Sequence, residues 1–355
     1  MSKKILMTGG GTAGHVTPNI ALFPYLKDAG YDILYVGSYD GIEKKLIEEQ
    51  NIAYKGISSG KLRRYFSMKN FTDPFRVLKG FSEAKKIIGE YKPDVIFSKG
   101  GFVSVPVVFA AKKYNVPTII HESDITPGLA NKLSIPKAVK VCHNFPETAS
   151  YLPADKSVLS GCPIRDELLS GDPVAGLNFC GFTPDKPVIM VIGGSLGALA
   201  VNNMVRKALP ELLKKYQLVH LCGKGKLDAS YSDLKGYIQF EYIEKELKDL
   251  FAMADIVISR AGANAICELQ ALKKPNILIP LPSSSSRGDQ ALNAASFEKQ
   301  GFSVVLQEET LTKEILINEV NKLYDNRQTY INSMNNAAQT NAIKTIVDLI
   351  KEYTK

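Results

Sequence analysis

The chain has 355 residues, of which 45% are hydrophobic, and no apolar run approaches the roughly 18–20 residues needed to span a membrane. Its five cysteines are scattered and never form Cys-x-x-Cys, which disfavours a disulfide framework or a zinc site and indicates a reducing compartment. The apolar run near the N-terminus is too short for a signal peptide, so we expect a cytoplasmic protein whose contact with a membrane is peripheral.

The net charge of +8 lies entirely in the first half of the chain. Residues 1–160 hold 22 Lys and Arg against 14 Asp and Glu, whereas residues 161–355 hold 22 of each. Eight of the basic residues fall within 60–86. This asymmetry predicts an anionic partner for one half of the chain only.

Strand and helix patterns alternate along the chain. A β-rich run at 3–8 breaks into the glycine turn GGGTAGH and then a helical pattern to about residue 28. Further strands, with amphipathic helices between them, are expected at 32–37, 94–98, 117–122 and 139–143. A second run at 187–192 breaks into GGSLGA and a helical pattern to about residue 215. The strands expected after it lie at 218–222, 237–242, 255–259, 276–280 and 303–306.

A buried strand, a tight glycine turn and a helix form the opening unit of a doubly wound α/β domain. Because this unit occurs twice, the sequence predicts two Rossmann-like domains in tandem, at 1–160 and 161–340, joined where SGCPIR has turn character. The sequence leaves open whether the terminal helical stretch at about 340–355 packs back on the first domain.

Three glycine loops, at 9–14, 98–102 and 193–198, each come directly after an expected strand. Glycines let a backbone approach a phosphate, and a following helix supplies free N–H groups. The first loop fits Gly-x-Gly-x-x-Gly, but no acid ends the second strand, so a nicotinamide cofactor is disfavoured. One such loop could be a plain turn; three favour two phosphorylated ligands facing each other across a cleft.

The sequence contains neither Gly-Lys-Ser/Thr nor Asp-x-Asp, so it lacks a Walker nucleotide site and the usual metal-holding pair of one class of sugar transferase. A departing diphosphate would then be stabilised by protein groups, and Arg165 is the best side-chain candidate. It is equally plausible that Arg165 is an ordinary solvated residue of the surface. Glu268 follows the strand at 255–259 and could accept both hydroxyls of a ribose. The alternative is an ordinary glutamate in the first turn of a helix.

Seven motifs occur in a fixed order: GGGTAGHVTP, SKGGFVSVP, HESD-x-x-PG, GCPIR, GGSLGA, SRAGA-x-x-x-CE and DQ-x-x-NA. Together, from residue 1 to about 301, they resemble the MurG family of glycosyltransferases. The resemblance implies the GT-B fold and no metal or other cofactor. It also implies transfer of N-acetylglucosamine from UDP-GlcNAc to undecaprenyl-linked lipid I, which gives the lipid II of peptidoglycan.

The resemblance also assigns roles to residues of this chain. Donor contacts would come from Arg165 and Ser195 to the diphosphate, Ile243 to uracil, Glu268 to ribose, Gln290 to the sugar, and Ala263 and Asn264 at a helix start. In the first domain, Thr12, Ala13 and Gly14 would line the cleft with His15 directed toward the acceptor, and Gly11, Gly100 and Gly101 are candidates for the acceptor's diphosphate.

The chain departs from the family at His121-Glu122-Ser123-Asp124, where the family usually has His-Glu-Gln-Asn. Leu196 and Phe102 also stand where glutamine and tyrosine are common. Asp124 thus replaces an amide that the resemblance assigns to the donor sugar, and an ionised aspartate can accept a hydrogen bond there but cannot donate one. The family inverts the anomeric centre, which requires a general base, and we consider His15 or Asp124. A helix start disfavours the imidazolium of His15, but its ring could instead only cap the glycine turn.

A mixed basic and aromatic segment precedes the helix expected to start at Asp73-Pro74. The candidate membrane patch comprises Leu62, Arg63, Arg64, Tyr65, Phe66, Phe75 and Lys79. Such residues suit the headgroup boundary of an anionic membrane. Within the helix, Phe81, Ala84 and Ile88 should form an apolar stripe that faces the sheet. The alternative to a membrane patch is an ordinary core helix in which Phe75 and Leu78 only continue this stripe.

Two other functions stay open on the sequence alone. The fold also suits another GT-B transferase or a UDP-GlcNAc 2-epimerase, which would need no lipid acceptor. The chain could also bind a nucleotide sugar without catalysis, although candidates for every catalytic role are present. We expect no nucleic-acid partner.

Overall fold

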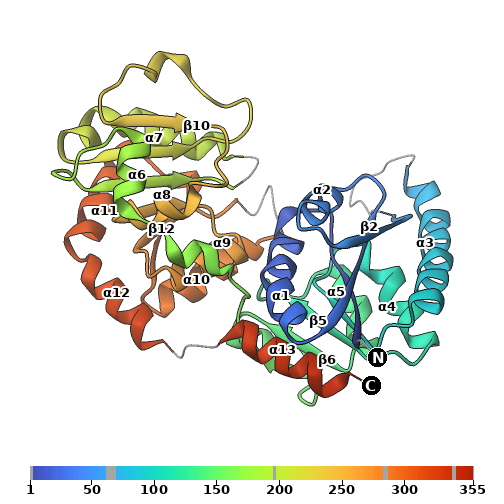
Figure 1. Ribbon diagram of the computed structural model, residues 1–355. Coiled ribbons are helices and arrows are strands. Elements are labelled where there is room, and N and C mark those ends of the chain that lie inside the picture. Colours follow the sequence, from blue (N-terminus) through green and yellow to red (C-terminus); the bar gives the residue numbers. More distant parts are fainter. Residues whose placement is uncertain (1–2, 61–68, 195–196, 283–286, 338–340, 355) are drawn as a thin grey trace. The chain divides into compact units, whose positions relative to one another are not determined.

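The computed structural model describes residues 3–60, 69–194, 197–282, 287–337 and 341–354 (Figure 1). The chain forms two compact units, Met1–Arg165 with Thr340–Lys355, and Asp166–Gln339. Each unit contains one parallel sheet with helices on its faces. The prediction of two doubly wound α/β domains is therefore confirmed.

The sheet of the first unit has seven parallel strands in the order β3-β2-β1-β4-β5-β6-β7. Their bounds are β1 Lys3–Thr8, β2 Tyr31–Ser38, β3 Ala53–Ile57, β4 Val95–Ser98, β5 Thr118–Glu122, β6 Lys140–His143 and β7 Ser157–Leu159. The sequence did not predict β3 and β7, which are the two edge strands. Both are short and only partly buried, so they lack the continuous apolar run of a central strand.

Both faces of this sheet are covered by helices. The helices are α1 Thr17–Asp28, α2 Ile42–Glu48, α3 Lys69–Tyr91, α4 Ser104–Lys113, α5 Leu129–Ser134 and α13 Ala342–Tyr353. Alternate residues of β1 enter different cores, because successive side chains of a strand point to opposite faces. Ile5 packs with residues of α1 and α13, whereas Leu6 packs with residues of α3 and α4.

The terminal helix α13 completes the core of the first unit. Its Ile346 and Ile350 are fully buried in the same apolar cluster as Ile5 of β1 and Leu22 of α1. Beyond the helix, the hydroxyl groups of Thr354 and Tyr31 lie 2.5 Å apart. The first unit is thus built from both ends of the chain.

Helix α3 begins at Lys69, so the expected start at Asp73-Pro74 is wrong. Pro74 lies in the second turn, where its missing N–H removes one backbone hydrogen bond without ending the helix. Farther along, Phe81, Ala84 and Ile88 pack on the sheet as predicted.

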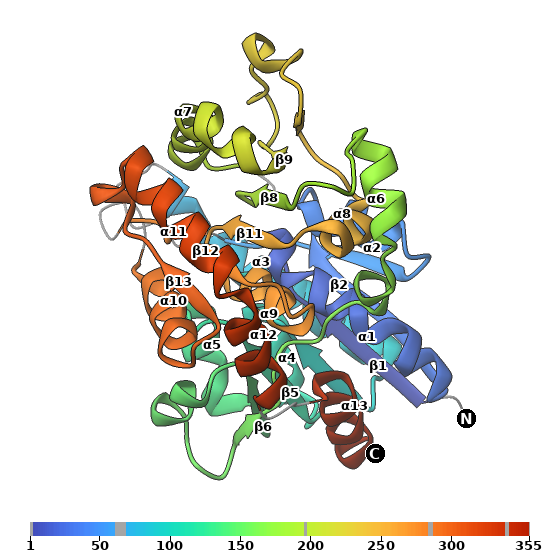
Figure 2. The ribbon, with the colours of Figure 1, turned by 90° about the vertical axis from the view of Figure 1, so that its left-hand side faces the viewer.

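The second unit contains six parallel strands in the order β10-β9-β8-β11-β12-β13. The strands are β8 Val188–Ile192, β9 Gln217–Leu221, β10 Tyr237–Phe240, β11 Ile256–Ser259, β12 Asn276–Leu278 and β13 Ser303–Val305. The helices are α6 Pro173–Cys180, α7 Leu199–Lys215, α8 Leu247–Met253, α9 Ala263–Ala271, α10 Asp289–Lys299, α11 Lys313–Asp325 and α12 Arg327–Asn336. Figure 2 shows α7 and α11 on one side of this sheet and α6 and α8 on the other.

In each sheet the strand order reverses beside the first strand of the unit. The reversal lies between β1 and β4 in the first unit and between β8 and β11 in the second. Open α/β sheets bind ligands at the carboxyl ends of the strands next to such a switch point. The glycine loops and the SRAGA turn follow these four strands, so the topology places these four motifs at the carboxyl ends of the strands beside the two switch points.

Candidate functional site

The two glycine loops of the first unit touch each other at the carboxyl ends of β1 and β4. Gly101 has a φ of +83°, and a Cβ added there would collide with the carbonyl oxygen of Gly10. A side chain at position 101 would therefore be both strained and obstructed. Backbone groups of both loops consequently lie at one edge, as a phosphate-binding arrangement requires.

Glu43 of α2 holds the first glycine loop, a role that the sequence did not predict. Its carboxylate accepts hydrogen bonds from the backbone N–H of Gly11 at 3.1 Å and of Ser38 at 2.9 Å. The side chain is fully buried. The N–H of Gly11 already donates to Glu43, so this N–H can donate to a phosphate only if that hydrogen bond breaks. The N–H of Gly100 instead donates to Ser98 Oγ at 3.3 Å.

The ring of His15 is fixed by the turn Ala13–His15. Its Nδ1 lies 3.0 Å from the carbonyl oxygen of Gly10 and 3.1 Å from Thr12 Oγ1. Because a carbonyl oxygen can only accept, we place the proton on Nδ1 and the lone pair on Nε2. The ring therefore caps the glycine turn with one nitrogen and keeps the other available as a base.

The surroundings of His15 also favour its neutral form. Burial and then the Lys99 ammonium lower the pKa of His15, while the charges of Asp124 and Glu43 and the carbonyl of Gly10 act in the opposite direction. The net effect is a lowered pKa, so the imidazole is unprotonated at neutral pH. A general base must be unprotonated to act.

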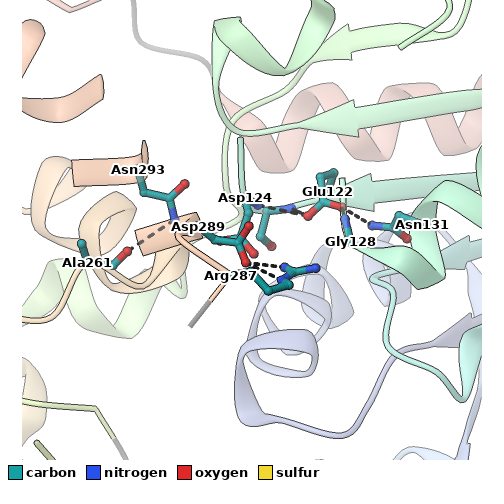
Figure 3. A network of polar contacts seen from close by, with 9 residues as sticks. Glu122, Asp124, Gly128, Asn131, Ala261, Arg287, Asp289 and Asn293 are labelled. Atoms are coloured by element: carbon teal, nitrogen blue, oxygen red, sulfur yellow. Dashed lines mark hydrogen bonds and ion pairs between the residues drawn. The ribbon is translucent and has the colours of Figure 1, made fainter. Parts of the chain in front are cut away.

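The loop that carries Asp124 is held by the buried carboxylate of Glu122 (Figure 3). Four groups donate to that carboxylate at 2.8–3.1 Å: the backbone N–H groups of Ser123, Asp124 and Gly128 and the side-chain amide of Asn131. Hydrogen bonds to an ionised acceptor are among the stronger ones in proteins. The loop is therefore fixed in one conformation, and the half-buried Asp124 lies close enough to act on the pKa of His15.

In the second unit, α9 begins directly after β11 and the SRAGA turn. Its N-cap is Gly262, which offers no side chain to the first N–H groups of the helix. Ala263 and Asn264 form that helix start, as the resemblance implied. Glu268 is half-buried and lies in the second turn, so its position is not that of a first-turn glutamate favoured by the helix dipole.

Helix α10 is tied to the neighbouring loops by amide side chains. Gln290 Oε1 accepts from the N–H of Leu281 at 3.1 Å. The buried Asn293 donates to the carbonyl oxygen of Ala261 at 3.4 Å, and Arg287 pairs with Asp289 at the helix start (Figure 3). These contacts fix Gln290 near the SRAGA turn.

The remaining donor candidates belong to both units. Arg165 is half-buried and is the last residue of the first unit, whereas Ile243 lies in the loop between β10 and α8 of the second. Ser195, like Leu196, is outside the described residues. Beside it, Gly197 has a φ of +67° and packs against the carbonyl oxygen of Cys222 so closely that no other residue would fit.

The membrane-patch candidates Leu62, Arg63, Arg64, Tyr65 and Phe66 also lie outside the described residues. At the start of α3, Phe75 is 74% exposed and Leu78 is 66% exposed, so neither continues the buried stripe. Lys79 is exposed and pairs with Glu83 at 3.8 Å. Large exposed apolar side chains beside lysines are typical of a membrane-surface helix.

Neither a membrane span nor a metal site is present in the described part of the chain. None of its helices is both long and apolar enough to cross a membrane. Among the described residues, no three His, Cys, Asp or Glu side chains form a cluster that could hold a metal ion.

The chain matches the glycosyltransferase family 28 N-terminal domain over residues 5–143 and the family 28 C-terminal domain over residues 188–350. It is 63% identical, over 99% of both chains, to the UDP-N-acetylglucosamine–N-acetylmuramyl-(pentapeptide) pyrophosphoryl-undecaprenol N-acetylglucosamine transferase of Lachnoclostridium phytofermentans. Its structure resembles the crystal structure of Acinetobacter baumannii MurG with a TM-score of 0.78 and 28% identity over 99% of both chains. The UDP-GlcNAc 2-epimerase of Methanocaldococcus jannaschii, at 13% identity and a TM-score of 0.69 over 99% of this chain and 100% of that one, shares the fold alone.

Proposed function

The chain belongs to glycosyltransferase family 28, and we propose that it transfers N-acetylglucosamine from UDP-GlcNAc to the MurNAc of undecaprenyl-pyrophosphoryl-MurNAc-pentapeptide. The observation that carries this proposal is 63% identity to a transferase of that name over 99% of both chains. The two sugar substrates are large and phosphorylated, and the chain offers two switch points at which such ligands bind.

The second unit would bind the donor. Glu268 lies on α9 and Gln290 on α10. We propose that the carboxylate of Glu268 accepts the ribose hydroxyls and that Gln290 contacts the sugar. The N-terminus of α9 presents backbone N–H groups and the positive end of the helix dipole, both of which favour the diphosphate. Ala263 and Asn264 belong to this helix start, and Ser195 and Ile243 are the other donor contacts we propose.

The first unit would bind the acceptor. Gly100 and Gly101 bring backbone close to the position where a diphosphate would lie, beside the turn that holds Thr12 and His15. We place the reacting hydroxyl of MurNAc near Nε2 of His15, since that nitrogen carries the lone pair. Asp124 is then the other candidate on this side and, in our proposal, positions substrate rather than removing the proton.

The reaction is a single displacement. His15 takes the proton of the acceptor hydroxyl as its oxygen attacks the anomeric carbon, and the bond from that carbon to UDP breaks on the opposite side. The transition state resembles an oxocarbenium ion, as in inverting glycosidases. Arg165 and the start of α9 stabilise the charge of the departing diphosphate, an electrostatic contribution that is often the largest in enzymes.

We also propose that the first unit docks on the cytoplasmic face of the cell membrane, where its lipid acceptor is anchored. The exposed Phe75 and Leu78 support this location, as does the net charge of +8 within residues 1–160. Apolar side chains would enter the headgroup boundary while basic residues attract anionic lipid.

Incubation of the purified protein with UDP-GlcNAc and a lipid I analogue tests the function. We expect a product heavier than the acceptor by one N-acetylhexosamine residue, with release of UDP in equal amount. A reaction with UDP-GlcNAc alone serves as the control. Release of an epimerised free sugar in that control, with no change in acceptor mass, would contradict the proposal and favour an epimerase.

A further inference from the structure

Lys99 is a buried cation at the edge of the acceptor site. It directly precedes Gly100 in the loop after β4, and it is only 1% exposed. Its Nζ donates to Nδ1 of His121 at 2.7 Å and also to the hydroxyl oxygen of Ser123. Removing an ammonium from water is unfavourable, so a lysine so deeply buried requires partners at fixed positions.

The direction of these hydrogen bonds follows from the chemistry of the groups. An ammonium can only donate, so Nδ1 of His121 accepts and the ring proton resides on Nε2. That Nε2 lies 3.0 Å from the carbonyl oxygen of Gly161, to which it donates. Burial and the Lys99 charge hold the pKa of His121 well below its usual range, which keeps this ring neutral.

Lys99 thereby braces the loop that carries Asp124. Glu122 holds the backbone of Ser123 and Asp124, while Lys99 holds the side chain of Ser123. The backbone N–H of Lys99 in turn donates to the carbonyl oxygen of Thr8 at 2.9 Å, at the end of β1 just before the first glycine loop. One residue therefore connects the carboxyl ends of β1, β4 and β5.

The charges that act on His15 come from three different elements. They are the ammonium of Lys99 after β4, the carboxylate of Asp124 after β5 and the carboxylate of Glu43 on α2. The two carboxylates favour the imidazolium, whereas Lys99 and burial oppose it. Without Lys99, two negative charges would act on His15 and no positive one from this set would oppose them.

We propose that Lys99 is a positioning residue of the transfer reaction: its buried ammonium fixes Ser123 and Asp124 beside His15 and compensates the charge of Asp124. This inference rests on the proposed function, in which His15 is the general base. Lys99 does not touch the reacting atoms. It keeps the base unprotonated and the neighbouring loop in place.

The first test is the pH dependence of kcat/KM. Lys99→Met keeps a buried chain of similar length but removes the charge, so the pKa of His15 should rise and the acidic limb should move to higher pH. Asp124→Asn removes a negative charge and should move that limb to lower pH. The double variant should return toward the wild type. We also expect kcat of Lys99→Met to fall by about 10- to 100-fold, because a loosened loop misplaces reacting groups.

The second test observes His15 directly. The chain has four histidines, so their imidazole signals can be assigned and titrated by NMR in wild type, Lys99→Met and Asp124→Asn. Opposite shifts of the His15 midpoint in the two variants would support the proposal. Unchanged midpoints, or shifts in one direction, would overturn it. If the midpoints shift as expected while the acidic limb of kcat/KM stays in place, the compensation stands and His15 is not the base, so the two failures are distinguishable.

Two further variants guard against a merely structural effect. Lys156→Met is the matched control, since Lys156 is half-buried and donates to the carbonyl of Ile135 at the amino end of the same sheet. It should leave the His15 midpoint and kcat unchanged.

Lys99→Gln retains a donor for His121 without the charge, and it replaces the methionine variant if that protein does not fold. It should raise the His15 midpoint in the same way, and failure to do so would overturn the proposal.

Discussion

Each unit has a neutral histidine near its ligand-binding edge, and the two rings are held very differently. His220 of β9 is fully buried, with Nδ1 bonded to the hydroxyl of Tyr237 at 2.8 Å and Nε2 to Asn202 Oδ1 at 3.0 Å. Burial and the nearby Arg206 lower its pKa to about 3. His15 is half-buried, and among the described residues its Nε2 makes no hydrogen bond.

The two histidines differ in whether a ring nitrogen remains available for proton transfer. Both nitrogens of His220 are used within the protein, where the ring joins β9 to Tyr237 of β10 and Asn202 of α7. His15 uses one nitrogen for structure and is surrounded by charged groups that set its protonation. In our proposal the first unit therefore supplies the base, and the second supplies fixed polar contacts to the donor.

The strongest test replaces His15 by alanine. We expect kcat to fall by about 10²–10⁴, the usual contribution of a general base, with the affinity for UDP unchanged. Rates come from steady-state assays and affinity from calorimetry. His220→Gln is the paired variant, and it should lower the melting temperature while kcat stays close to that of the wild type. A kcat of His15→Ala within threefold of the wild type would remove His15 from the mechanism.

A second variant tests how the second unit binds the donor. Glu268→Ala should weaken UDP and UDP-GlcNAc equally, because both contain the ribose, by ~1.5–3 kcal/mol for lost hydrogen bonds to a charged group. Calorimetry with both ligands measures the change. Glu298, an exposed glutamate on α10 of the same unit, is a suitable control position, and its alanine variant should bind normally. Unaltered UDP affinity in Glu268→Ala would mean that this carboxylate has only a structural role.

A third variant concerns the exposed start of α3. Replacing Phe75 and Leu78 by serine should weaken sedimentation with anionic liposomes by about tenfold or more, since burying one large apolar side chain contributes ~1.5–3 kcal/mol. UDP affinity should not change. Binding of the wild type should also weaken as salt rises. Equal sedimentation of variant and wild type would place the docking surface elsewhere on the molecule.

A smaller effect is expected for Asp124→Asn. If His15 is the base, kcat at neutral pH should stay within about threefold of the wild type, because the amide restores the residue typical of the family. A fall of about 10² or more with normal UDP affinity would instead assign the base to Asp124. Single-turnover measurements at several pH values distinguish the two outcomes.

The smallest expected effect is that of a chelator. The sequence has no Asp-x-Asp, and protein groups are available for the leaving diphosphate, so saturating EDTA should leave most turnover intact. The assay follows UDP release before and after treatment. Complete loss of activity that magnesium or manganese restores would disprove this prediction.

The sequence was informative where structure depends on local pattern. Apolar runs followed by glycine turns correctly predicted both sheets and the elements that follow β1 and β8. The start of α3 was misjudged because Asp-Pro is a strong start signal, and only the observed helix shows that it continues upstream to Lys69. The edge strands β3 and β7 lack the apolar runs by which central strands are detected.

The candidate site was predictable only in part, for a physical reason. Glycine loops and the HESD segment are motifs, so their residues could be named from sequence. Glu43 and Lys99 act through contacts with residues 32 and 22 positions away, and nothing in their local sequence indicates burial of a charge. The pairing of β2 with β1 brings Glu43 to the first glycine loop, and the pairing of β4 with β5 brings Lys99 to His121.

The discontinuous first unit has a consequence for how the protein is made. Ile346 and Ile350 belong to the same core as Ile5, yet they are synthesised after the entire second unit. At ~5–20 residues per second, ribosomes would need on the order of 10–35 s to make that intervening stretch. Throughout this interval the nascent first unit exposes the apolar surface that α13 later covers. Loss of the last dozen residues would leave that surface permanently open, so a late stop codon should impair the part of the protein made first.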